Sequence, residues 1–88
     1  PIPAPVIPYK YAVEMICDGL AAGKTYTGKG WDPSMQLEYW KKEREKAIIN
    51  EKTCNFLTAA FTEIAEKGLD KTLNKKRLKE LYKKYCES

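Results

Sequence analysis

Apolar residues recur every three or four positions along most of this chain, which is the spacing of amphipathic α-helices. The first such segment runs from Tyr9 to about Ala22, and Gly23 is a favourable residue for the end of a helix. Its apolar stripe is formed by Ala12, Val13, Ile16, Cys17 and Leu20. The glycine-rich residues 23–31 lack this periodicity and predict a loop.

Two further helices are predicted in the middle of the chain. Asp32 can cap free N–H groups and Pro33 suits the first helical position, so the second helix starts there and runs to about Lys46. Asn50 caps the third helix, which continues to Lys67. The apolar sides of these two helices contain Leu37, Trp40, Ala47, Ile48, Cys54, Leu57, Phe61, Ile64 and Ala65.

A last helix completes the pattern. Gly68 ends the third helix, and Thr72 or Asn74 caps a fourth that runs to about Cys86. Its apolar stripe consists of Leu78, Leu81, Tyr82 and Tyr85. No stretch alternates as a β-strand would. We therefore predict an all-α fold, a small bundle of three to four short helices around Val13, Ile16, Leu20, Trp40, Leu57, Phe61, Leu78 and Leu81.

The N-terminal residues differ from the rest because four of the first eight are proline. Proline fixes φ and removes backbone donors, so residues 1–8 are predicted to be an extended linker or arm before a helical domain at residues 9–88. The chain starts with Pro1 and not with methionine, which led us to expect a processed form or a fragment of a longer protein.

Composition narrows the class of protein. With 88 residues, 43% apolar and 32% charged, the chain suits one globular domain. Its three cysteines, an odd number, argue against a secreted disulfide scaffold; we expect Cys17 and Cys54 to be buried thiols and Cys86 to lie near a frayed end. The absence of histidine excludes a histidine-based nucleophilic site or haem ligand and disfavours a zinc site. No membrane-spanning run or signal peptide is visible, so a cytoplasmic location is expected.

Charge is concentrated in the last helix. The net charge is +4, and residues 71–88 contain seven basic and two acidic residues. The candidate basic surface consists of Lys75, Lys76, Lys79 and Lys83. With tyrosines interleaved, such a surface could hold a phosphate backbone or a protein partner. The tyrosines fall on the apolar stripe, however, which favours core packing and a solubilising role for the lysines.

The segment from Gly23 to Lys29 fits the letters of a phosphate-binding loop, GxxxxGK. That motif requires a strand before it, a helix directly after it and a serine or threonine next to the lysine. Here a helix precedes the segment and Gly30 follows Lys29. We therefore do not expect nucleotide binding through this loop.

Two carboxylates, Glu14 and Asp18, stand four residues apart on one side of the first predicted helix. This spacing could present both to a divalent metal ion. Carboxylates at this spacing are also common on exposed helix faces, where Lys10 could pair with Glu14. From spacing alone, the solvated face is the favoured interpretation.

Three tracts resemble a known family: residues 8–18 (PYKYAVEMICD), residues 37–40 (LEYW) and residues 78–85 (LKELYKKY). Together they resemble the C-terminal part of an uncharacterised bacterial and phage family whose full-length members have a histidine-rich, HD-like N-terminal half. The resemblance implies that Asp18 matches the last aspartate ligand of a metal-dependent phosphohydrolase site, with Glu14 beside it. The family has tryptophan after the Cys-Asp pair, whereas this chain has Gly19.

Two functional hypotheses follow. In the first, the chain is the helical C-terminal part of a larger HD-like phosphohydrolase and is inactive without the histidine-bearing half. In the second, it is a small basic module that binds nucleic acid or a protein partner. If a covering half is missing, Tyr11 and Met15, which lie away from the apolar stripe, are expected to be buried in a homodimer.

Overall fold

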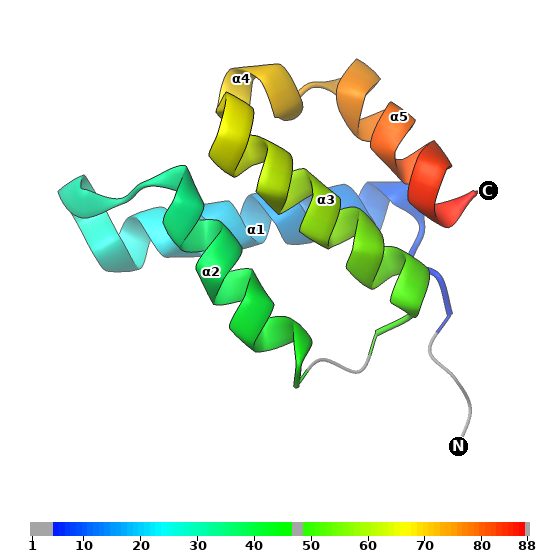
Figure 1. Cartoon of the computed structure of the whole chain (residues 1–88), viewed down its shortest axis with the longest axis horizontal. Helices are drawn as coiled ribbons and strands as arrows, with labels where there is room; N and C mark the ends of the chain where they lie inside the picture. The colour runs from blue at the N-terminus through cyan, green and yellow to red at the C-terminus, as the bar shows by residue number, and fades with distance from the viewer. Residues whose placement is uncertain (1–4, 47–48, 88) are drawn as a thin grey trace.

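The computed structural model describes residues 5–46 and 49–87, and every regular element in that part of the chain is helical (Figure 1). The longer helices are α1 (Tyr9–Thr27), α2 (Pro33–Arg44), α3 (Glu51–Lys67) and α5 (Lys75–Cys86). A 3₁₀ turn, η1 (Gly28–Gly30), follows α1, and a single helical turn, α4 (Leu69–Thr72), precedes α5. The predicted all-α fold is confirmed.

Helix α3 is the centre of the bundle. It contacts α1, α2, α4 and α5, and Figure 1 shows it lying across α1, with α2 and α5 to its two sides. This arrangement explains why α3 has the broadest buried surface, with Phe56, Ala60 and Ile64 completely inaccessible to solvent. None of the described helices is both long and apolar enough to cross a membrane.

Side-chain caps start three of the helices where the sequence predicts them. The carboxylate of Asp32 accepts a hydrogen bond from the Ser34 amide at 2.8 Å, and Pro33 occupies the first turn of α2. The amide oxygens of Asn50 and Asn74 accept from Lys52 N and Arg77 N, both at 2.8 Å. Each cap satisfies an N–H group that has no partner within its helix. Asn74, and not Thr72, therefore caps α5.

The predicted end of the first helix at Gly23 is wrong, because α1 continues to Thr27 and ends at Gly28, whose φ is 70°. Gly23 is glycine for a different reason. A Cβ at this position would overlap the side-chain oxygen of Gln36 and lie 2.9 Å from Trp31 Nε1. Gly23 thus lets side chains from the start of α2 approach the α1 backbone, and residues 24–27 are helical instead of forming a loop.

The buried core agrees closely with the apolar pattern. Of the eight predicted core residues, all are buried except Val13, which is half-buried. The structure adds Phe56, whose ring packs edge-to-face on Tyr82 at a centroid distance of 5.4 Å. The indole of Trp40 donates to Thr58 Oγ1 at 2.8 Å, which satisfies its polar atom inside the core. The predicted apolar residues Ala47 and Ile48 lie outside the described residues.

The cysteine assignment requires a correction. Cys17 is exposed, whereas Cys54 and Cys86 are buried. The buried stripe of α1 is narrow and contains Ala12, Ile16 and Leu20, which leaves Cys17 at its edge. Cys86 lies under α3, with its sulfur 3.5 Å from the Lys52 carbonyl oxygen, and burial raises the pKa of its thiol.

The described part of the proline-rich arm, residues 5–8, is attached to the bundle. The backbone N–H of Ile7 donates to Thr53 Oγ1 on α3 at 3.0 Å. The hydroxyl of Tyr82 on α5 donates to the carbonyl oxygen of Ile7 at 2.7 Å. Both backbone groups of one residue are therefore bound, and Ile7 links α3 to α5.

Candidate functional site

The two carboxylates proposed as metal ligands lie on the outer face of α1. Glu14 and Asp18 are both exposed, and neither forms an ion pair with a described residue. The expected pair between Lys10 and Glu14 is likewise not formed. Within residues 5–46 and 49–87, no group of three or more His, Cys, Asp or Glu side chains is arranged to hold a metal ion. The two carboxylates are therefore accessible groups that the fold itself does not use.

The four candidate lysines of α5 share one surface. Lys75, Lys76, Lys79 and Lys83 are all exposed, and at 100° per residue they fall within about 100° of helix circumference. None of the four is paired with a carboxylate in the part of the chain that the structure describes. Tyr9 borders this face and packs edge-to-face on Tyr82 at 5.5 Å. We call these four lysines the basic face of α5.

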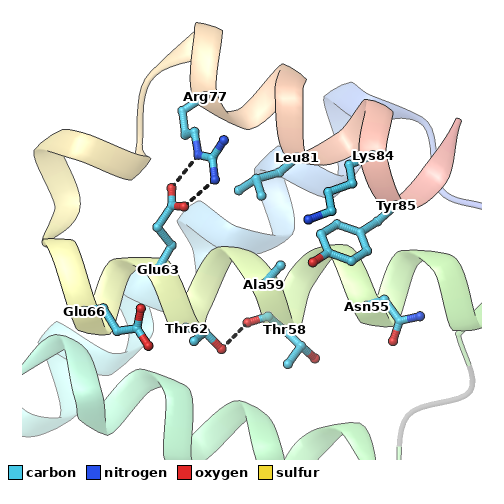
Figure 2. Close-up of a pocket in the computed structure, with 10 residues that line it drawn as sticks. All are labelled: Asn55, Thr58, Ala59, Thr62, Glu63, Glu66, Arg77, Leu81, Lys84 and Tyr85. Atoms are coloured by element: carbon cyan, nitrogen blue, oxygen red, sulfur yellow. Dashed lines mark hydrogen bonds and ion pairs between the residues drawn. The ribbon is translucent and has the colours of Figure 1, made fainter. Parts of the chain in front are cut away.

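A polar groove lies between α3 and α5 (Figure 2). It is dominated by an ion pair in which Arg77 Nε and Nη2 donate to the two carboxylate oxygens of Glu63, at 2.8 and 2.6 Å. The hydrogen bond from Arg77 holds the pKa of Glu63 below its ordinary value, and the same pair raises the pKa of Arg77. Arg77 is thus occupied in joining α5 to α3, although it belongs to the most basic part of the sequence.

A second pocket lies between the C-terminal half of α1 and the start of α2. The sequence pattern did not indicate it, because its walls combine Gly19 and Gly23 of α1 with Trp31 and the α2 residues Gln36 and Tyr39. The spacing of the glycines is the signal that could have revealed it. Two glycines four residues apart leave one side of a helix without side chains, which lets a neighbouring element approach closely.

The segment that resembles a phosphate-binding loop has no such geometry. Residues 23–27 are the last turn and a half of α1, and residues 28–30 form the 3₁₀ turn η1. A helix precedes the segment, so its backbone N–H groups are used inside that helix and do not converge on a common point. The absence of nucleotide binding here stays a prediction.

Comparison with known proteins adds no relative of this chain. No protein-family model, no curated protein and no solved structure matches it.

Proposed function

We propose that this domain is the helical C-terminal part of a cytoplasmic, metal-dependent, HD-like phosphohydrolase, in which Asp18 supplies one metal ligand and Glu14 lies beside it. The observation that carries the proposal is that both carboxylates of the resembling tract are exposed and unused on one face of α1. A catalytic metal ion activates water and neutralises charge on a phosphoryl group. Because this chain has no histidine, the remaining ligands come from another polypeptide segment.

The same face explains how such a segment would be accommodated. Tyr11 is 56% exposed, and Met15 one turn later is half-buried against the core. The exposed small residues Ala21 and Ala22 continue the face toward the end of α1. An apolar surface of this kind favours contact with a further segment or with a second copy of the chain. Dimerisation through Tyr11 or Met15 therefore stays part of this proposal.

The metal site is tested in a protein that also contains the segment encoded immediately upstream of Pro1. We expect that protein to bind Mn²⁺ or Zn²⁺ and to release phosphate from a phosphomonoester. Asp18→Asn is expected to lower metal affinity by more than about 10-fold, since even residues that only support metal ligands have effects of that size. Metal content by mass spectrometry and phosphate release are the measurements.

Asp70→Asn is the matched control, because Asp70 is an exposed carboxylate on α4. It is expected to leave metal content and phosphate release unchanged. An upstream segment without histidine, or equal metal content in Asp18→Asn and the unsubstituted protein, would refute the phosphohydrolase proposal.

The second candidate function is a basic module for nucleic acid, and the basic face of α5 favours it specifically. Four exposed lysines that pair with no described carboxylate, with Tyr9 at their edge, suit weak contacts with the backbone of a single strand. Release of counterions from four contacts corresponds to a slope of about −3 in log K against log salt concentration. We expect fluorescence anisotropy with a single-stranded oligonucleotide to show this weak, salt-sensitive and sequence-independent binding.

Reversing the charge of selected lysines distinguishes binding at the basic face of α5 from general attraction of nucleic acid to a positively charged protein. Lys75→Glu, Lys76→Glu and Lys79→Glu combined are expected to abolish the binding. Lys41→Glu, Lys42→Glu and Lys46→Glu combined change the net charge equally at exposed positions in the last turn of α2 and the turn after it, and most of the binding should remain. Equal losses in both triple variants would show that the basic face is not a site.

A further inference from the structure

The pocket between α1 and α2 has the size and lining of a small-molecule site. Its volume is about 450 Å³, within the range of roughly 300–1,000 Å³ that is usual for ligand pockets. The floor is the α1 backbone at Gly19 and Gly23, and the walls include Trp31, Met35 and Tyr39. Met35 and Tyr39, which lie at the rim, are large apolar side chains and are 44% and 59% exposed to solvent.

Two polar groups inside this pocket have no partner in the described structure. Gln36 is only 4% exposed, yet its side-chain amide makes no hydrogen bond with residues 5–46 or 49–87. The indole nitrogen of Trp31 is also buried and has no acceptor there. Buried polar groups are nearly always hydrogen-bonded, so the buried indole N–H of Trp31, with the unbonded Gln36 amide beside it, suits a ligand that bonds to both.

The positions of these groups restrict the chemistry of the ligand. Gln36 Nε2 lies over Gly19, where a Cβ would be 3.1 Å away, whereas its oxygen and Trp31 Nε1 both lie over Gly23. The site therefore offers two N–H donors and one carbonyl acceptor. Its lining contains no charged side chain, although the Lys24 ammonium stands 5.1 Å from the centre of the Trp31 ring.

We propose that this pocket binds a small, neutral, planar cyclic amide. The ligand carbonyl accepts from Trp31 Nε1, and the ligand N–H donates to the Gln36 oxygen, which lies with that indole nitrogen over Gly23. A flat ring suits the Tyr39 phenol in the wall, because aromatic faces stack on one another, whereas Trp31 meets the ligand with its N–H edge. A neutral ligand suits the pocket because none of the lining side chains is charged. This site is separate from the carboxylates of α1 and from the basic face of α5.

The experiment uses 2-pyridone as the probe and follows the two indole N–H signals in ¹H–¹⁵N spectra. Trp40 is the internal control, because its indole already donates to Thr58. We expect 2-pyridone to shift the Trp31 signal saturably and to leave that of Trp40 in place. N-methyl-2-pyridone lacks the N–H and should bind about 3- to 10-fold more weakly, the effect of one net hydrogen bond.

Two variants test the polar groups separately. Gln36→Met keeps the length of the side chain and removes its amide, and it should weaken 2-pyridone binding at least as much as methylation of the ligand does. Trp31→Phe removes the indole donor and is read at the backbone amide of Gly23. A thermal melt confirms that each variant is folded, and either variant alone suffices if the other does not fold.

Three results would overturn the proposal. The first is a Trp31 signal that does not move up to the solubility limit of 2-pyridone. The second is equal affinity for 2-pyridone and toluene, or an affinity that neither variant changes, because the pocket would then be merely apolar. The third is a Trp31 signal that moves with protein concentration alone, together with a dimer in sedimentation equilibrium, which would make a second copy the occupant.

Discussion

Phe61→Ala is expected to lower the free energy of unfolding by about 3–5 kcal/mol, measured by urea denaturation. Phe61 is 3% exposed at the point where α3 meets both α1 and α2. Its ring lies 5.9 Å from that of Trp40, and its outer edge approaches Gly19. Truncation would remove contacts with α1 and α2 and leave a cavity. A domain of this size has a total stability of only about 4–13 kcal/mol, so the loss is a large fraction.

Two comparisons make this result specific. Leu57→Ala, at a side chain that is 1% exposed on the same face of α3, should cost about 2–5 kcal/mol. Asn55→Ala, on the exposed face of the same helix, should change stability by less than about 0.5 kcal/mol. Losses below about 0.5 kcal/mol at both Phe61 and Leu57 would mean that α3 packs with a different face inward.

The ion pair between Glu63 and Arg77 gives the second large expected effect. Glu63→Gln should destabilise the protein by about 1–3 kcal/mol at neutral pH, since it breaks a bidentate contact whose carboxylate side is buried. The upper end of the range for buried pairs is not expected, because the Arg77 side chain is 36% exposed and water screens it. The measurement is the free energy of unfolding of both proteins between pH 7 and pH 3.

The pH dependence has a definite sign. Arg77 lowers the pKa of Glu63 in the folded state, so its stabilising contribution is complete above the ordinary value of 4.5. That contribution is lost as the pH falls through the lowered pKa. The stability difference between Glu63→Gln and the unsubstituted protein should therefore shrink below pH 4.5. Glu80→Gln, at a side chain that is 52% exposed, is the control, and its effect should stay below about 0.5 kcal/mol. A Glu63→Gln deficit that is constant over this pH range would contradict this account.

Local signals in the sequence were sufficient to locate most helix starts. Asp32, Asn50 and Asn74 cap helices through atoms two or three residues away, so the information is contained in a few adjacent letters. The end of α1 could not be located in this way. Glycine is typical of helix ends, so the sequence predicts one at Gly23. The side chains that require glycine there belong to Trp31 and Gln36, which lie 8 and 13 positions further along the chain.

The candidate sites also differ in whether they depend on one helix or on the packing of two. The sequence spacing predicted that Glu14 and Asp18 share one side of α1 and that the four lysines share one side of α5. Each prediction depends only on positions within a single helix. The pairing of Glu63 with Arg77 depends on how two helices pack, and helical periodicity carries no information about it. The pocket around Gln36 likewise depends on the approach of α2 to α1.

The attachment of Ile7 has a consequence for the order in which the molecule folds. Its two hydrogen bonds join residues that are 46 and 75 positions apart in the chain. Closing loops of that length lowers the entropy of the chain before the contact stabilises it, so such contacts form late. The contacts of α3 with α2 and with α5 join segments that are closer in sequence and can form first. The docking of residues 5–8 is then expected to be the last step, and it makes Ile7 and α5 part of one cooperative unit.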